Sequence, residues 1–181
     1  MTEKERIYSE LLVLRCRRKD RGAFEELIRC WDMKLYYFIR RLVTDEEDAW
    51  DILQETWVKV LQGIGSLKNP GSLAAWLYSI ARHSAMDHFR DRYAEVQTEE
   101  IDEEALVEIP EDNTQDFDDA ERVHRGLDRI SLAHREALTL FFLEDFSIDE
   151  IASILNVSPG TVKSRLHYAK RALRLVLEKE V

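Results

Sequence analysis

The amino-acid sequence predicts an all-α protein built from two small helical domains joined by an acidic, flexible linker. Apolar residues recur at the 3.6-residue spacing of a helix, not at the two-residue spacing of a strand. The 181 residues include only six Gly and three Pro, so turn-forming residues are scarce and a many-stranded β protein is disfavoured. A strongly acidic segment separates the two helical parts.

The net charge of −10 is concentrated in that segment. Residues 95–121 carry 13 acidic residues and no Lys or Arg, whereas residues 1–94 carry 16 basic and 15 acidic residues, and residues 122–181 carry 10 and 8. The acidic average therefore does not argue against a nucleic-acid partner, because the flanking parts are nearly neutral.

A dense run of like charge repels itself and resists folding. We therefore predict a first domain over residues 1–94, a linker over 95–117 and a second domain over 118–181. The linker has two interpretations: it is a solvated spacer, or it is an acidic strand that occupies a basic channel in a partner and mimics nucleic-acid charge.

The first domain contains several predicted helices. Apolar residues follow one helical face from Phe24 to Leu42. Four acids at residues 45–48 suit the N-terminus of a helix that runs to about Gln62, because the helix dipole favours negative charge there. Residues 63–72, rich in Gly, Pro and Asn, form a loop, after which Ser72 caps a long helix to about Tyr93.

The second domain is predicted to contain four short helices in a compact bundle. The first is expected over residues 118–130. Ser131 is a suitable N-cap for the second, over residues 132–145.

The most informative stretch has the spacing of a helix-turn-helix. Ser147 and Glu150 form a capping-box pattern, so a third helix begins there and ends at Asn156. Pro159 then begins the fourth helix, at a position where its missing N–H costs nothing. One apolar stripe of this fourth helix must pack on the third helix; the two sets are Val162, Leu166, Ala169 and Leu173, against Ile151, Ala152 and Leu155.

The opposite face of the fourth helix is polar and basic. Its members are Gly160, Ser164, His167, Arg171 and Arg174, flanked by Thr161, Lys163 and Tyr168. Residues 154–174 hold five Lys or Arg and no acid. Such a helix fits the major groove of DNA, where short polar side chains reach base edges and cations neutralise phosphates. The alternative is an ordinary helical hairpin with a solvated basic face.

The helix over residues 48–62 has one apolar and one polar face. The apolar face is formed by Ala49, Leu53, Thr56, Trp57 and Val60. The other shows Asp51, Gln54, Glu55, Val58 and Gln62, with Trp50 and Leu61 at the margin. This face would dock a basic partner helix; the alternative is a solvated face with no partner.

The helix over residues 72–93 combines aromatic and basic side chains. The residues predicted on its core side are Leu73, Leu77, Ile80, Ala81, Ser84 and His88. Those predicted on its outer face are Ser79, Arg82, His83, Met86 and Arg90. Four aromatic residues are predicted around the outer face: Trp76, Tyr78, Phe89 and Tyr93. Aromatic rings stack on unpaired bases and cations bind phosphates, so this face suits single-stranded nucleic acid, with residues 66–71 as the wall of a pocket for one extruded base. The alternative is that some of these aromatics are core residues.

No catalytic or cofactor motif is present. The phosphate-binding, dinucleotide-binding and HExxH patterns are absent. His83 and Asp87 lack a third ligand, so neither a metal nor a cofactor is expected. Because no catalytic motif is found, we do not expect an enzyme. Cys16 and Cys30 are expected to be reduced thiols. Together with the charged N-terminus and the lack of a long apolar run, they favour a cytoplasmic protein.

Three motifs in this order resemble the extracytoplasmic-function sigma factors, promoter-recognition subunits of bacterial RNA polymerase. The first is Asp51-x-x-Gln54-Glu55, and the second runs from Trp76 to Arg82 and continues to Asp87 and Arg90. The third spans residues 127–173. The resemblance covers residues 23–177, nearly the whole chain.

The resemblance implies a role for each motif. Residues that would bind the clamp of the largest subunit of bacterial core RNA polymerase are Asp51, Gln54, Glu55 and Val58. Residues that would contact the minus-ten element, melted and single-stranded, are Lys68, Asn69, Trp76, Ser79, Arg82, His83, Asp87 and Arg90. Residues that would read the duplex minus-thirty-five element are Ser158, Gly160, Thr161, Lys163, Ser164, Arg165, His167, Tyr168 and Arg171.

The sequence departs from the family pattern at two positions. Trp50 stands where the family often has Glu, and His83 stands where it often has Asn. Neither the middle domain of housekeeping sigma factors nor an N-terminal self-inhibiting domain is present, so we expect restraint from outside, by an anti-sigma protein. The linker would thread toward the polymerase active site and RNA exit channel.

Two other functions compete with this hypothesis. A stand-alone helix-turn-helix repressor or activator predicts tight duplex binding without polymerase, usually as a dimer. A helical adaptor that binds only proteins predicts no salt-dependent DNA affinity for the second domain.

Overall fold

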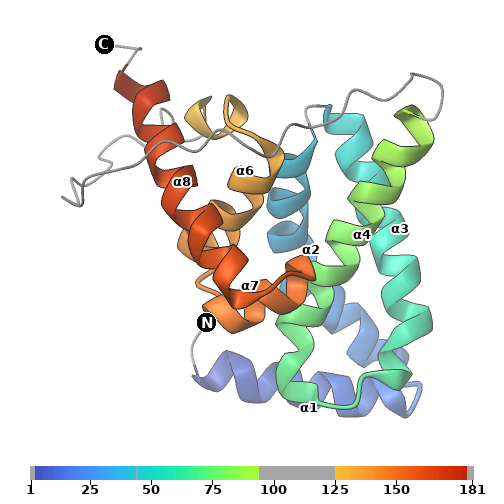
Figure 1. Cartoon of the computed structure of the whole chain (residues 1–181). Coiled ribbons are helices and arrows are strands. Elements are labelled where there is room, and N and C mark those ends of the chain that lie inside the picture. Colours follow the sequence, from blue (N-terminus) through green and yellow to red (C-terminus); the bar gives the residue numbers. More distant parts are fainter. Residues whose placement is uncertain (1–2, 44, 94–124, 179–181) are drawn as a thin grey trace.

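Every regular element of the described chain is a helix, which confirms the predicted all-α class. The computed structural model describes residues 3–43, 45–93 and 125–178 (Figure 1). The N-terminal domain contains α1 (Glu3–Arg17), α2 (Arg21–Leu42), α3 (Glu46–Gly63) and α4 (Leu73–Tyr93), and the C-terminal domain contains α6 (Leu132–Leu138), α7 (Ile148–Leu155) and α8 (Pro159–Glu178). The predicted acidic linker, residues 95–117, lies outside the described residues. Within the described ranges, no helix combines the length and the apolar character needed to cross a bilayer.

Helix α2 is the central helix of the N-terminal domain. It starts shortly before the predicted Phe24, because the Asp20 side chain caps it and accepts a hydrogen bond from the Ala23 amide at 3.1 Å. Its buried face carries the predicted apolar stripe: Ala23, Leu27, Trp31, Leu35, Tyr36, Phe38, Ile39 and Leu42.

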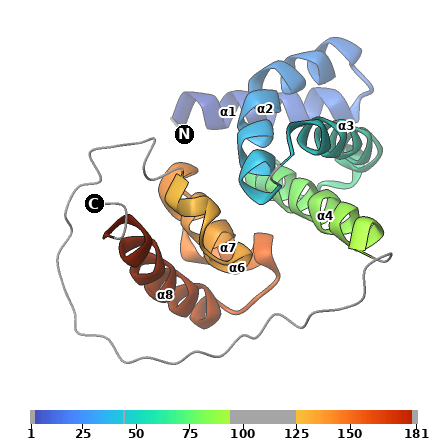
Figure 2. The same cartoon turned by 90° about the horizontal axis from the view of Figure 1, so that it is seen from above.

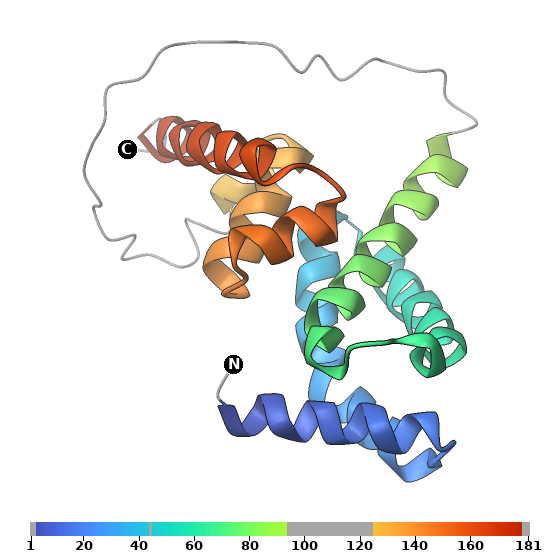
Figure 3. The same ribbon diagram turned by 60° about the horizontal axis from the view of Figure 1, so that its bottom comes forward.

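Helix α1 was not predicted from the sequence. It lies across one end of the N-terminal domain (Figure 3) and packs on α2 and on the loop before α4. Leu12, Val13 and Cys16 are buried, but Ile7 and Leu11 are exposed. Because its apolar residues lie on more than one face, no single helical stripe is visible in the sequence.

Helices α3 and α4 form the rest of the N-terminal domain. Asp45 caps α3 and accepts from the Glu47 amide at 2.7 Å, as the acidic cluster at its start predicted. The loop over residues 63–72 contains two short 3₁₀ turns, Ile64–Ser66 and Pro70–Ser72. The prediction that Ser72 caps α4 was wrong: its backbone amide donates to the Asn69 carbonyl at 3.1 Å and closes the second 3₁₀ turn, and its hydroxyl donates to the same carbonyl at 2.8 Å.

The C-terminal domain follows the predicted helix boundaries closely. Ser131 caps α6, accepting from the His134 amide at 3.4 Å. The helix then continues as a π-helical turn, Thr139–Leu143, so the helix predicted over residues 132–145 starts where expected but widens in its second half and ends two residues early, at Leu143. Of the helix expected over residues 118–130, residues 125–128 are helical and residues 118–124 lie outside the described residues.

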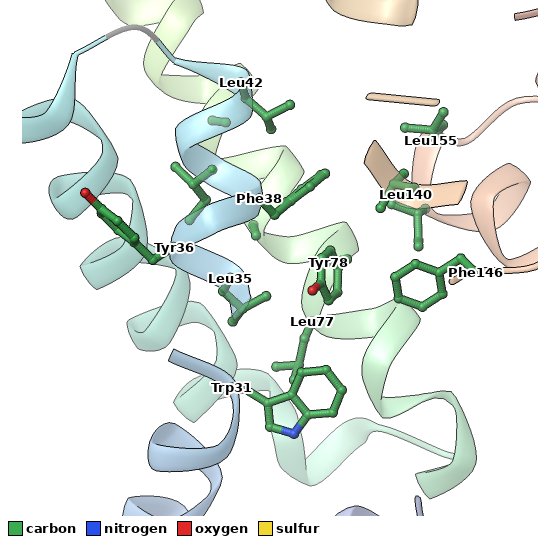
Figure 4. Packing of buried hydrophobic residues seen from close by; sticks show 14 of the residues in the cluster. Trp31, Leu35, Tyr36, Phe38, Leu42, Leu77, Tyr78, Leu140, Phe146 and Leu155 are labelled. Atoms are coloured by element: carbon green, nitrogen blue, oxygen red, sulfur yellow. The ribbon is translucent and has the colours of Figure 1, made fainter. Parts of the chain in front are cut away.

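The two domains pack against each other in the described structure. Helix α4 contacts α7, and α2 contacts α6, while α8 lies on the side of the C-terminal domain that faces away from the N-terminal one (Figure 2). An aromatic layer crosses the boundary: the centroid of the Tyr78 ring lies 5.0 Å from that of the Phe38 ring and 5.0 Å from that of the Phe146 ring (Figure 4).

Tyr78 therefore corrects a prediction. The sequence placed it among the aromatics around the outer face of α4, but it is 1% exposed. Its ring is covered by Phe146 of the C-terminal domain, a contact that helical periodicity cannot reveal because periodicity does not identify the partner of a face.

We predict that Ser147→Ala lowers the free energy of unfolding by about 1 kcal/mol, because the first turn of α7 loses the side-chain acceptor for the Glu150 amide. Urea unfolding followed by circular dichroism measures this change. Ser147→Thr, which keeps the hydroxyl, is the control and should retain most of the stability. Equal destabilisation by both substitutions would contradict the capping role.

Candidate nucleic-acid interfaces

Helices α7 and α8 form the predicted helix-turn-helix, and local hydrogen bonds define its corners. The Ser147 hydroxyl accepts from the Glu150 amide at 3.3 Å, and the Glu150 carboxylate accepts from the Ser147 amide at 2.9 Å, which is the predicted capping box. Asn156 ends α7 in the left-handed region at φ 55°. Ser158 then caps α8, accepting from the Thr161 amide at 3.0 Å.

The two faces of α8 have the separation that the sequence predicted. The apolar stripe is buried: Val162, Leu166, Ala169 and Leu173. The opposite side is open to solvent, with Ser158, Gly160, Lys163, Ser164, His167 and Arg174 exposed and Thr161, Arg165, Tyr168 and Arg171 half-buried. The structure thus brings the predicted minus-thirty-five residues together on one accessible helix face, along a stretch that carries cations and no acid.

A second candidate surface lies along α3. The predicted polymerase-binding residues Asp51, Gln54, Glu55 and Val58 are all exposed on one side of this helix. The buried side contains the predicted Ala49, Leu53, Thr56, Trp57 and Val60, together with Ile52.

Two apolar residues extend the exposed face of α3. Trp50 and Leu61 lie at helical spacing with Gln54 and Val58 and are themselves exposed. The Trp50 ring stacks on Tyr36 of α2, with ring centroids 4.3 Å apart. From the sequence, Trp50 and Leu61 were predicted only at the margin of this face. Positions 50, 54, 58 and 61 are three to four residues apart, and this spacing indicates that they share one face of the helix.

The loop before α4 is held by hydrogen bonds from its own residues and from α1. Arg17 donates to the Lys68 carbonyl at 3.2 Å. The Asn69 side chain accepts from the Gly71 amide at 3.0 Å. The side chains of Lys68 and Asn69 are exposed, so this loop presents a polar edge beside the start of α4.

The outer face of α4 contains half-buried and exposed groups from the predicted minus-ten set. The Trp76 ring lies so close to Gly63 that an added Cβ would come within 3.0 Å of it. His83 is exposed, and its Nδ1 lies 2.7 Å from the Ser79 carbonyl oxygen. Arg90 is exposed one turn from the C-terminal end.

Lys59 connects the α3 and α4 surfaces. Its Nζ lies 2.7 Å from a Glu55 carboxylate oxygen and 3.0 Å from Asp87 Oδ2. The hydrogen bond from Lys59 holds the pKa of Asp87 below its ordinary value of 3.8, and the Arg90 charge acts in the same direction. Asp87 is therefore an ionised, paired carboxylate near neutral pH.

Arg82 differs from the other predicted minus-ten residues, because the C-terminal domain contacts its guanidinium. Its Nε donates to Glu136 Oε1 at 2.7 Å and its Nη2 donates to Glu136 Oε2 at 3.3 Å. The Glu136 carboxyl is 2% exposed, and burial raises its pKa although Arg82 opposes that shift. The sequence did not predict this ion pair.

Among the residues that the structure describes, no group of three or more His, Cys, Asp or Glu side chains is placed to hold a metal ion.

Comparison with known proteins identifies the family. A model of sigma-70 region 2 matches residues 27–95, and a model of sigma-70 region 4 matches residues 120–173. The chain is 33% identical over 156 residues to the ECF RNA polymerase sigma factor SigL of Mycobacterium tuberculosis, covering 80% of this chain and 82% of that protein. It is also 32% identical over 138 residues to the RNA polymerase sigma factor SigV of Bacillus subtilis, covering 76% of this chain and 81% of that one.

The chain belongs to the extracytoplasmic-function sigma factors. Two solved structures have a similar fold. The sigma factor RpoE of Bartonella quintana, crystallised with the anti-sigma factor NepR, matches with a TM-score of 0.69 and 26% identity over 86% of this chain and 96% of that one. CnrH in complex with the cytosolic domain of CnrY matches with a TM-score of 0.71 over 96% and 99%, but at 21% identity it supports the fold alone.

The sigma factor's Lys59 is predicted to control the ionisation of Asp87. Lys59→Met removes the hydrogen bond that lowers the Asp87 pKa, so that pKa should rise toward 3.8. A depressed carboxyl pKa stabilises the fold above pH 3.8, and that stabilisation is lost as the pH falls through the folded-state pKa. The variant should therefore lose less stability on acidification.

A carboxyl-carbon NMR titration measures the Asp87 pKa directly. Lys163→Met, which removes an exposed lysine on the far domain, is the matched control and should leave the titration unchanged. An Asp87 pKa in the Lys59→Met variant equal to that of the wild type would show that Lys59 does not set it.

Proposed function

We propose that this sigma factor binds bacterial core RNA polymerase and directs it to specific promoters, and that it catalyses no reaction itself. The observation that carries the proposal is the exposed, acid-free face of α8 in a chain that also contains a separate exposed acidic and apolar face on α3. One surface suits DNA and the other suits a basic protein partner. Their order along the chain is that of sigma regions 2 and 4.

The upstream promoter element is bound by α8. Lys163 and Arg171 supply cations, while Ser164 supplies a short polar group near the helix start. Such side chains bind phosphates and base edges in the major groove. The amides in the first turn of α8 add partial positive charge where a phosphate would lie.

The downstream element is bound in its melted form by α4 and the preceding loop. Trp76 supplies an aromatic surface, and Lys68 and Arg90 supply cations. Unpaired bases stack on aromatic rings, which duplex bases cannot do. Melting is then driven by tighter binding of the single strand than of the duplex.

The clamp of the largest polymerase subunit is bound by α3. Asp51 and Glu55 suit a basic partner helix, and Val58 supplies an apolar contact one turn beyond Glu55. Because polymerase is the partner, we also infer that the protein acts in the cytoplasm. The relative from Bartonella quintana was crystallised with an anti-sigma factor, which supports an anti-sigma protein as a further partner here.

Mixing the full chain with bacterial core polymerase tests the function. We expect co-elution on size exclusion and promoter-dependent run-off transcription from genomic fragments. No co-elution and no transcription would contradict the proposal. Tight duplex binding by a dimer without polymerase would instead support a stand-alone repressor or activator.

Two variants should separate DNA reading from polymerase binding. Arg171→Ala should weaken binding to a mapped upstream element by roughly 1–3 kcal/mol, about 5- to 150-fold, and leave core binding unchanged. Gln54→Ala combined with Glu55→Ala should weaken core binding and leave the DNA affinity of the C-terminal domain unchanged.

Fluorescence anisotropy with labelled promoter DNA and with labelled core polymerase measures both affinities. Lys4→Ala, at an exposed position of α1, is the control and should change neither. If both variants lose both activities equally, the assignment of separate surfaces is wrong.

A further inference from the structure

Helix α1 has two apolar sides, and only one of them faces the protein. Three apolar residues of α1 are buried toward the rest of the domain: Leu12, Val13 and Cys16. At about 100° per residue, Ile7, Leu11 and Leu14 lie on the opposite side of the helix. Their side chains are 57%, 50% and 47% exposed. These three residues form an apolar stripe, the outer seam, that does not contribute to the core.

The outer seam lies at an edge of the molecule. Helix α1 crosses one end of the N-terminal domain (Figure 3), and its buried side packs on α2 and on the loop before α4. The outer seam is therefore turned away from the elements on which α1 packs. A single exposed leucine is ordinary on a protein surface, but three aliphatic side chains in one continuous row indicate a binding surface.

The spacing within the outer seam selects the kind of partner. Positions 7, 11 and 14 are four and three residues apart, which is the pattern by which one helix packs along another. At about 100° per residue the three positions span an arc of only about 60°. So narrow a stripe is typical of a helix-packing seam, whereas a helix that lies in a lipid surface needs a broad apolar face. The outer seam therefore suits a second helix better than a membrane.

Cations gather at the C-terminal end of the outer seam. Arg18 continues the seam by one further turn, and Lys19 follows it; both are exposed. Lys68 is also exposed, and its carbonyl accepts a hydrogen bond from Arg17 at 3.2 Å. Residues 11–19 contain four Lys or Arg and no acid. This end of the seam therefore favours carboxylates on a partner.

Two acids close to this end are matched by a different cation. The Arg15 Nε lies 2.9 Å from Asp20 Oδ2, and its Nη1 lies 3.0 Å from Glu26 Oε2. Arg15 holds both carboxylates on the side of α1 that meets α2. The positive charge of Arg18 and Lys19 is therefore not offset by these two acids.

We propose that the outer face of α1 is a docking site for one amphipathic helix of a partner protein. That helix carries aliphatic side chains at the i, i+4 and i+7 spacing, which pack along Ile7, Leu11 and Leu14. Acidic side chains at one of its ends lie over Arg18 and Lys19. The site is on a different helix from the surfaces proposed for polymerase and for the minus-thirty-five element, so it does not depend on the proposed function.

A synthetic peptide of about four helical turns, the length of α1 from Lys4 to Arg18, is the probe. It has leucines at i, i+4, i+7 and i+11 and glutamates at one end. It is titrated into the full chain, with Ile and Leu methyl groups labelled for NMR. We expect the methyl signals of Ile7, Leu11 and Leu14 to shift, and a peptide with lysines in place of the glutamates to bind several-fold more weakly. Unchanged signals at the outer seam, or equal affinity for the two peptides, would overturn the inference.

Leu11→Ser tests the apolar part of the site. Because Leu11 is 50% exposed, a partner can bury about half of its side chain, so the affinity for the glutamate peptide should fall roughly 3- to 10-fold. Leu11→Met keeps an apolar side chain and should bind like the wild type. Leu175→Ser, at an exposed leucine of α8, is the matched control. Equal affinities of Leu11→Ser and Leu175→Ser would contradict a role for the outer seam.

Arg18→Gln combined with Lys19→Gln tests the charged part without changing the apolar row. This variant should bind the glutamate peptide more weakly and with less dependence on salt concentration. Lys170→Gln, at an exposed lysine of α8, is the control and should bind like the wild type. A salt dependence that the double variant leaves unchanged would overturn the acidic character of the partner.

Two further measurements examine other occupants of the outer seam. Sedimentation of the free chain shows whether a second copy covers it, and binding to phosphatidylglycerol vesicles shows whether a lipid surface does. We expect a monomer and no vesicle binding. A dimer that Leu11→Ser dissociates, or vesicle binding that Leu11→Ser abolishes, would overturn the assignment to an acidic partner helix.

Discussion

The separation of apolar and basic residues on the two sides of α8 is the constraint on which the C-terminal domain depends. Val162 and Leu166 must be buried for the helix to pack, and that packing turns Lys163 and His167 toward solvent. Because the same helix contains no acid beside these cations, its outer face can approach a polyanion without an opposing charge. Folding and the proposed DNA binding are thus two consequences of one residue pattern.

A different balance governs α4. Burial of a carboxylate is unfavourable unless a cation lies close to it, and Glu136 meets this requirement mainly through Arg82 of the other domain, with a smaller contribution from Arg165.

The sequence was sufficient for the features that depend on local chemistry. The capping box at Ser147, the turn at Asn156 and the start of α8 at Pro159 are short-range signals, and each was predicted at the correct residue. Helix α1 was not predicted, because its apolar residues follow no single face, and Ser72 was misassigned because Asn69 competes for the same turn.

The contacts between domains could not be predicted from spacing. Helical periodicity indicates that Tyr78 and Glu136 lie on helices, but it does not show that Phe146 covers one and Arg82 binds the other. Helical spacing could have assigned the exposed residues Trp50 and Leu61 of α3 to the same face as Gln54 and Val58. They were predicted only at its margin, because charged residues stand between them in the sequence.

We propose that the two helical domains read two separate stretches of one promoter while bound to polymerase. Run-off transcription of genomic DNA by core polymerase and this chain, with sequencing of the transcript starts, measures whether both stretches are read. We expect start sites that align on two shared sequence elements separated by nearly two duplex turns. Start sites that share only one element, or that match those of core polymerase alone, would contradict it.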